Sequence, residues 1–208
     1  MSAHRDASLE LARRSPVLAA LVDEHGPMRI PARTPVAGRF ESIARAITFQ
    51  QLAGRAAETI WGRVRALTPD GFTPAAVLAL DPASLRGAGL SGAKTAAVLD
   101  LALHVDTGQV PLERLGRLPD DEVVATLTQV RGIGPWTAQM FLIFDLHRPD
   151  VWPTGDLGVR AGYQRAFGLD ALPSPRELDV LGDPFTPHRS VLAWYCWRVL
   201  ETTTPEAR

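Results

Sequence analysis

Apolar residues recur at three- and four-residue spacing along most of this chain, and this period decides its fold class. From Phe40 to Leu67 they mark one face of one or two helices. The same spacing predicts further helices over 74–80, 82–87, 93–108, 119–130, 134–146, 156–167 and 187–201. The sequence has no alternating strand pattern of useful length, and its connections are short. It therefore predicts an all-α fold, in which the proline-rich stretch 172–187 is an ordered connector.

The composition fits one large helical domain or two small interlocked ones, because 46% of the 208 residues are hydrophobic and 22% are charged. Runs of about 18 or more apolar residues are missing from the sequence. The N-terminus MSAHRDASLE lacks the basic-then-apolar order of a secretory signal. We therefore expect a cytoplasmic protein with no membrane partner. No feature of the sequence requires more than a monomer.

Charge and cysteine content exclude several classes of function. A formal net charge of −1 argues against a protein that coats polyanions, so any nucleic-acid site must be local. The single cysteine, Cys196, cannot form an intramolecular disulfide, a four-cysteine iron–sulfur cluster or a cysteine-rich zinc site, and we expect it in the core. Lys94 is the only lysine among 22 basic residues, which leaves few candidates for amine chemistry.

The stretch VRGIGPWTAQ, residues 130–139, breaks a helical pattern with two glycines and a proline. Gly132 and Gly134 allow a sharp turn, because glycine accepts positive φ and leaves room for another backbone. Pro135 suits the first turn of a new helix. The unpaired N–H groups and positive dipole end of that helix can bind an anion such as a DNA phosphate, although many such turns only connect helices.

A second polar signal follows in DVWPTGDLGVRAG, where Asp156 opens a helix directly after Gly155. An aspartate at this place commonly caps the helix by accepting hydrogen bonds from its first N–H groups. It can also present an ionised carboxylate to a cleft, because the helix end stabilises its charge. The residues alone leave both interpretations open.

Together, LTQVRGIGPWTAQ and the P-x-G-D-L-G segment resemble the helix-hairpin-helix and Gly/Pro-Asp region of the HhH-GPD superfamily of DNA glycosylases. Within it the chain looks most like the AlkA-type 3-methyladenine DNA glycosylases. The stretches FESIARAITFQQLAGRAAETIWGRV, LRGAGLSGAKTAAVLDLA and PHRSVLAWYCWR resemble segments of that family in the same order. The resemblance thus extends from about Pro16 to Leu200.

The resemblance implies a two-lobed helical fold with a cleft between the lobes. We expect one lobe over residues 39–148, containing the hairpin, and a second made from residues 1–38 and 149–208. The resemblance also implies an enzyme that flips a damaged nucleotide out of double-stranded DNA. Such an enzyme hydrolyses the bond between base and sugar and leaves an abasic site for base-excision repair.

Matching motifs imply roles for individual residues. Asp156 would stabilise positive charge on the sugar and orient the attacking water. An aromatic wall would attract a cationic alkylated purine of the 3-methyladenine or 7-methylguanine type. The base pocket would be lined by Trp136, Trp197 and Met140. The DNA backbone would be held by Val130, Arg131, Gly132, Ile133, Gly134 and Thr137, with a monovalent cation on the carbonyls of Val130 and Gly132.

Several of these residues have a purely structural alternative. Gln50 or Gln51 would fill the gap left by the flipped base, where some relatives use leucine, or would lie on a solvated helix end. His188 and Arg189 would contact phosphate, or Arg189 would pair with a surface carboxylate. For the two tryptophans the alternative is ordinary core packing.

Bifunctional members such as endonuclease III carry a lysine directly after the hairpin's G-x-G-x, and it forms a Schiff base with the sugar. Trp136 occupies that place here. The resemblance therefore implies monofunctional hydrolysis without AP-lyase activity and without a cofactor or iron–sulfur cluster. The alternatives are a non-catalytic module that only grips DNA phosphates, and a glycosylase for hypoxanthine, uracil or 8-oxoguanine.

Overall fold

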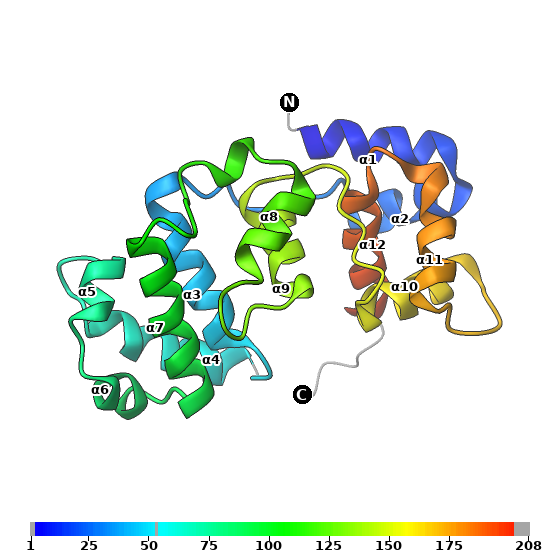
Figure 1. The fold of residues 1–208 in the computed structure, drawn as a ribbon. Helices are drawn as coiled ribbons and strands as arrows, with labels where there is room; N and C mark the ends of the chain where they lie inside the picture. Colours follow the sequence, from blue (N-terminus) through cyan, green and yellow to red (C-terminus); the bar gives the residue numbers. More distant parts are fainter. Residues whose placement is uncertain (1–2, 53, 202–208) are drawn as a thin grey trace. The chain divides into compact units, whose positions relative to one another are not determined.

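The computed structural model describes residues 3–52 and 54–201, which form two compact helical units (Figure 1). Unit 1 is built from Met1–Ala32 and His147–Arg208, and unit 2 is Arg33–Leu146. The lobe expected over 39–148 differs from unit 2 by six residues at its start and two at its end. No β-strand occurs among the described residues, so the all-α prediction is confirmed. None of the described helices is long and apolar enough to cross a membrane.

Unit 1 joins the two ends of the sequence. The N-terminal helices α1 (Ala3–Arg14) and α2 (Pro16–His25) pack on the C-terminal helix α12 (Arg189–Glu201), which also packs on α10 (Leu157–Phe167) (Figure 1). Cys196 lies fully buried in this core, as expected. The neighbouring Tyr195 is equally buried and donates a hydrogen bond from its hydroxyl to the Gly26 carbonyl at 2.9 Å.

The connector of residues 172–187 contains a helix that the apolar period did not reveal. Helix α11 (Pro175–Gly182) is followed by a short 3-10 turn, η4 (Asp183–Phe185). The Ser174 hydroxyl accepts a hydrogen bond from the Glu177 N–H, and the Glu177 carboxylate accepts one from the Ser174 N–H. This reciprocal cap satisfies two N–H groups that the helix start leaves unpaired. An S-x-x-E signal in the sequence therefore marks the helix start.

The longest helix of unit 2 is α7 (Gly92–Asp106), which packs on α3 (Arg39–Phe49) and on the short α5 (Pro74–Leu78). Its remaining helices are α4 (Gly54–Ala66), α6 (Pro82–Gly87), α8 (Asp120–Leu127) and α9 (Pro135–Met140). The helix expected over 134–146 is α9 continued by a π-helical segment, η3 (Phe141–Asp145). Its core holds fully buried aliphatic side chains, each stabilising the fold by roughly 2 kcal/mol through removal of apolar surface from water: Ile47, Val98, Leu101, Leu127 and Ile143.

The contact between α10 and α12 in unit 1 depends on a glycine. A Cβ at Gly162 would lie 2.8 Å from the Cα of Cys196 and closer still to its carbonyl group. The obstacle is backbone rather than the end of a flexible side chain, so the helices could not relieve the clash without separating. Glycine at 162 therefore sets how closely these two helices approach.

Replacing Gly162 with alanine should lower the free energy of unfolding by about 3 kcal/mol, because overpacking would force the two helices apart. Gly62→Ala is the matched control, since a Cβ there meets nothing within 4 Å on the helix α4. That control should raise stability by about 0.5 kcal/mol through helix propensity. Chemical denaturation measures both, and equal stabilities of the two variants would contradict this account of the packing.

Candidate functional site

The glycine-rich turn of unit 2 forms a helical hairpin. Helix α8 ends at Leu127, the chain turns over residues 128–134, and α9 begins at Pro135. Gly132 has φ of +79°, and a Cβ on it would lie 3.1 Å from the Cβ of Ala97 on α7. Both the left-handed backbone and the lack of space therefore require glycine at this position. The turn begins three residues earlier than the sequence predicts, because α8 ends at Leu127 rather than at residue 130.

Hydrogen bonds attach this hairpin to neighbouring elements of unit 2. The Arg131 N–H donates to the Asp100 carboxylate on α7 at 2.7 Å. The Gln50 side-chain amide donates to the Gly132 carbonyl at 3.0 Å and to the Thr137 hydroxyl at 3.2 Å. Val130 and Ile133 are buried, whereas Arg131, Gly132 and Gly134 are exposed. The hairpin is thus fixed from two sides with its tip toward solvent.

Lys94 holds the segment that carries Gln50, a role that the sequence alone did not reveal. Its ammonium group donates to the carbonyls of Thr48 and Gln50 at 2.7 and 2.6 Å, at the C-terminal end of α3. A cation is favoured there because the last carbonyls of a helix carry its negative dipole end. Partial burial lowers the pKa of this lysine. The signal in the sequence is that the only lysine of the chain stands in GLSGAK, at the start of α7.

A pocket of about 430 Å³ lies beside the hairpin within unit 2. Trp136, the second residue of α9, is 48% exposed and forms part of its wall, so this ring is not core packing. The expected pocket residue Met140 also lines it, as do the wedge candidates Gln50 and Gln51. Phe49, Ala46 and Thr137 complete the lining. Two of the three expected base-pocket residues are therefore brought together.

Asp156 caps α10 in unit 1, which is the structural alternative that the sequence left open. Its Oδ1 accepts a hydrogen bond from the Val159 N–H at 2.7 Å. The same oxygen accepts one from the indole Nε1 of Trp197 on α12 at 3.1 Å. The carboxyl group is only partly buried. The cap does not exclude a chemical role, because the residue stays partly exposed while the cap fixes one carboxylate oxygen.

Gly158 makes room for this arrangement. A Cβ at position 158 would lie 3.0 Å from Asp156 Oδ1 and 3.1 Å from Cδ1 of Trp197. Gly158 and Gly162 stand one helical turn apart, so they face the same side of α10. Their four-residue spacing is the sequence signal for a close helix contact at this place. Trp197, expected as a wall of the base pocket, is placed here against Asp156.

Arg189 is the first residue of α12 in unit 1, and His188 directly precedes it. The Arg189 guanidinium donates two hydrogen bonds to the carboxylate of Asp150, each at 2.8 Å. These bonds raise the pKa of Arg189. Arg189 therefore pairs with a carboxylate, the alternative that the sequence left open. A phosphate would have to compete with Asp150 for this guanidinium group. A phosphate contact by half-buried His188 stays a prediction.

The hairpin carbonyls offer little to the expected monovalent cation. The Val130 carbonyl accepts a hydrogen bond from the Ile133 N–H, and the Gly132 carbonyl accepts one from Gln50. Each carbonyl retains one further lone pair. Two such oxygens would supply only part of the coordination shell of a monovalent cation. Binding of a cation at the hairpin therefore stays a prediction.

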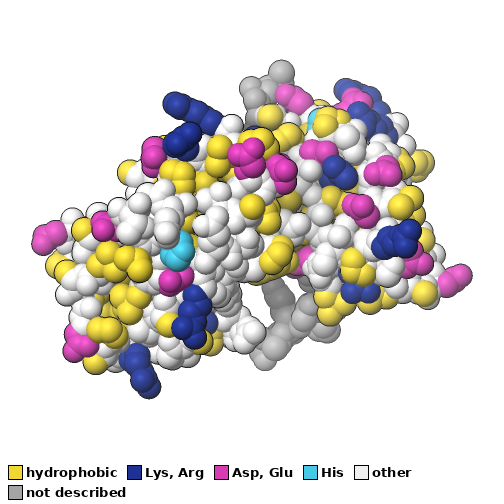
Figure 2. Space-filling model, in the orientation of Figure 1, with side chains coloured by type: hydrophobic (Ala, Val, Ile, Leu, Met, Phe, Trp, Pro, Cys, Tyr) yellow, Lys and Arg dark blue, Asp and Glu magenta, His cyan; other side chains and the backbone are white. Residues whose placement is uncertain are grey.

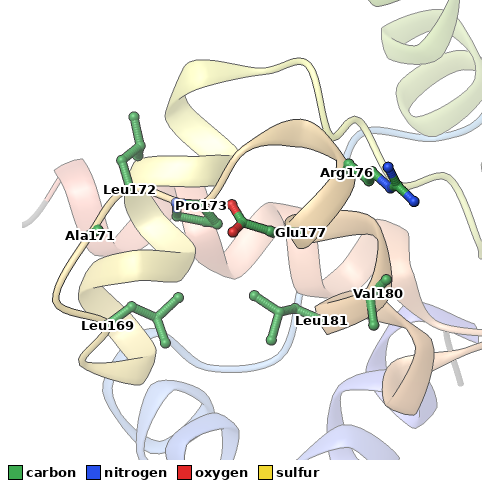
Figure 3. A pocket seen from close by; sticks show the side chains of 8 residues that line it. All are labelled: Leu169, Ala171, Leu172, Pro173, Arg176, Glu177, Val180 and Leu181. Atoms are coloured by element: carbon green, nitrogen blue, oxygen red, sulfur yellow. The ribbon is translucent and has the colours of Figure 1, made fainter.

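Two other surface features contain no comparable chemistry. A pocket of about 510 Å³ in unit 1 lies between the end of α10 and α11, where Leu169 and Leu181 point toward one another (Figure 3). Its Glu177 is already used in the cap of α11. On the face drawn in Figure 2, basic and acidic side chains are interspersed. This agrees with the expectation, from net charge, that any nucleic-acid site is local.

Comparison with known proteins places these features in a family. Residues 44–183 match the family model described as HhH-GPD superfamily base excision DNA repair protein. The chain is 34% identical to DNA-3-methyladenine glycosylase 1 of Schizosaccharomyces pombe over 162 residues, which cover 76% of this chain and 71% of that protein.

Solved structures give the same result. The 3-methyladenine DNA glycosylase Mag1 of Schizosaccharomyces pombe, in complex with abasic DNA, has a TM-score of 0.83 and 31% identity, covering 93% of this chain and 95% of that one. A DNA-3-methyladenine glycosidase of Bacillus halodurans has a TM-score of 0.82 and 29% identity, covering 97% and 90%. On the family model, the hairpin and these similarities, the chain belongs to the HhH-GPD superfamily of base excision DNA repair proteins.

Proposed function

We propose that this protein is a DNA glycosylase that removes alkylated purines from double-stranded DNA by hydrolysis. The similarity to proteins named DNA-3-methyladenine glycosylase supports this activity. The observation that carries it here is the carboxylate of Asp156, fixed through one oxygen by Val159 and Trp197. A module that only gripped DNA would gain nothing from an anion held beside a polyanion.

Departure of the base leaves positive, oxocarbenium-like charge on the deoxyribose. A carboxylate beside the sugar stabilises that charge as it develops, and a fixed group does so without reorganisation in the transition state. The N–H groups of Val159 and Trp197 supply the fixation by holding Oδ1 of Asp156. The same carboxylate orients the water that attacks the sugar.

The pocket beside the hairpin supplies selectivity for alkylated bases. Methylation at purine N3 or N7 gives the base a positive charge, which the face of an electron-rich ring attracts. Trp136 is half-exposed in a pocket large enough for a purine. Met140 in the same wall adds a polarizable, apolar contact.

Hydrolysis without strand cleavage follows from where the amines are. A lyase step requires an amine that attacks the sugar carbon. Trp136 stands where bifunctional relatives have lysine, and Lys94 donates to two backbone carbonyls at the end of α3. The reaction would therefore end at the abasic site.

The hairpin would bind one phosphate of the DNA backbone through the N–H groups that precede and open α9. Gly134 has no structural reason within the chain to be glycine: its φ is −93°, and a Cβ there would meet nothing within 4 Å. The open space at this position suits the close approach of a phosphate.

Gln51 is the better candidate for the side chain that fills the gap left by the flipped base. Gln50 is already hydrogen-bonded to the hairpin, whereas Gln51 is exposed and stands in the turn after it with φ of 56°. The cytoplasmic location and monomeric state stay predictions.

Changing Asp156 to asparagine should slow base release by at least about 100-fold, because the developing positive charge loses its partner. Asparagine caps a helix as well as aspartate does, so stability and affinity for an abasic duplex should be retained. Single-turnover assays on duplexes containing 7-methylguanine measure the rate. Asp81→Asn, at the cap of α6, is the matched control. Unchanged base release in Asp156→Asn would contradict the catalytic role.

Gly134→Ala should weaken binding to an abasic duplex about tenfold by blocking a phosphate from the hairpin N–H groups, while leaving thermal stability unchanged. Gly132→Ala should instead lower stability by about 1 kcal/mol, because its backbone is left-handed. Fluorescence anisotropy and thermal unfolding separate the two effects. Full duplex affinity in a folded Gly134→Ala protein would rule out the phosphate contact.

Trp136→Leu should reduce kcat/KM about tenfold on cationic 3-methyladenine and 7-methylguanine, and less on neutral hypoxanthine, because only the charged bases lose a cation–π contact. Parallel assays should include duplexes with uracil and 8-oxoguanine. Leu103→Ala, a similarly exposed apolar residue of unit 2, is the control. An equal loss on every base, or preferred release of uracil or 8-oxoguanine by the unmodified protein, would overturn the proposed substrate class.

A further inference from the structure

A second polar pocket in unit 2 gathers arginines at the opposite end of α8 from the hairpin. It has a volume of about 390 Å³. The segment before α3 contributes Arg33, and α3 itself begins with Arg39. The 3-10 turn η2 (Leu115–Arg117), which leads into α8, contributes Gly116 and Arg117. The eight residues of α8 span about 12 Å, so this pocket is separate from the phosphate position proposed at the hairpin.

Two guanidinium groups meet at Gly116. The position of a Cβ on this residue lies 2.9 Å from Nη2 of Arg33 and 3.1 Å from Nη2 of Arg39. The two positive groups are therefore close neighbours, and the missing side chain of residue 116 leaves them room. Like charges at this spacing repel unless an anion lies between or beside them.

Arg39 is buried without a full set of partners. It is 4% exposed, yet its buried Nε has no hydrogen-bond acceptor in the described structure, and its Nη1 donates to the carbonyl of Leu112. Buried guanidinium groups are normally satisfied, because an unmet donor costs its desolvation energy. Burial lowers the pKa of Arg39 and the charge of Arg33 lowers it further, whereas Asp145 opposes the shift.

The nearby carboxylates form no ion pair with these two arginines in the described structure. Asp145 uses Oδ1 to accept hydrogen bonds from the hydroxyls of Thr34 and Ser42. Glu113 lines the pocket but is exposed. Among the residues that the structure describes, no carboxylate forms an ion pair with Arg33, Arg39 or Arg117. The three arginines of the pocket therefore outnumber the two carboxylates near them, Asp145 and Glu113, and are not ion-paired with either.

We propose that the pocket formed by Arg33, Arg39, Gly116 and Arg117 binds a phosphate group. Planar guanidinium groups match the oxygens of oxyanions. A tetrahedral anion can accept hydrogen bonds from several directions, which suits arginines arriving from two separate segments better than a planar carboxylate does. The phosphate belongs either to a DNA backbone or to a free phosphate compound, and the site acts independently of the proposed base excision.

Isothermal titration with inorganic phosphate, at ionic strength matched with chloride, tests the proposal on the full chain. The unmodified protein and the control Arg63→Gln, altered on the exposed face of α4, should bind phosphate saturably. Arg33→Gln should lose affinity about tenfold through removal of charge-assisted hydrogen bonds. Gly116→Ala should lose a similar factor, because its Cβ would lie 2.9 Å from Nη2 of Arg33 and 3.1 Å from Nη2 of Arg39 and would displace both donors.

Each result decides the proposal. Loss of binding in both variants and not in the control supports the site. No saturable binding to the unmodified protein, or equal binding by every folded variant, overturns it. A second titration in the presence of an abasic duplex identifies the source: displacement of phosphate indicates a DNA phosphate, and undisturbed binding indicates a free phosphate compound. Arg33 is exposed, so Arg33→Gln leaves the core unchanged, and thermal unfolding checks that Gly116→Ala, whose Cβ would lie against buried Arg39, is folded.

Discussion

The close approach of α10 and α12 in unit 1 is the constraint on which the proposed chemistry depends. Gly162 brings the backbone of α12 against α10, and Gly158, one turn earlier, leaves space for the ring of Trp197. The indole N–H then reaches Oδ1 of Asp156 at 3.1 Å. The same carboxylate thus caps α10 and serves the proposed chemistry, because the hydrogen bonds to its Oδ1 also fix its orientation.

In unit 2, a glycine turn and hydrogen bonds to neighbouring helices hold the hairpin in one conformation. Gly132 supplies the left-handed turn, the Asp100 carboxylate accepts a hydrogen bond from the preceding Arg131 N–H, and Gln50 connects the tip to the end of α3. Lys94 holds that end through two carbonyls. A hairpin fixed before DNA arrives loses little conformational entropy on binding, which strengthens a phosphate contact.

Sequence reasoning recovered most helices from Phe40 onward, the hairpin and the helix position of Asp156, because period, glycine and proline act locally. It did not identify α1, α2 or α11, although Ser174 and Glu177 carry the capping signal of α11. It also did not separate Gln50 from Gln51, assign Lys94, or place Trp197 against Asp156. These depend on contacts between segments far apart in the chain, such as α3 with the hairpin, which no local pattern records.

The central claim is that the carboxylate of residue 156 stabilises positive charge on the sugar. The most direct measurement compares affinity for two duplexes that differ only at one abasic position: an uncharged tetrahydrofuran or a cationic pyrrolidine ring. The account predicts tighter binding of the cationic duplex, by about 100-fold, since it resembles the transition state. That preference should vanish when the carboxylate is replaced by an amide. Equal affinity of the unmodified protein for both duplexes would contradict the account.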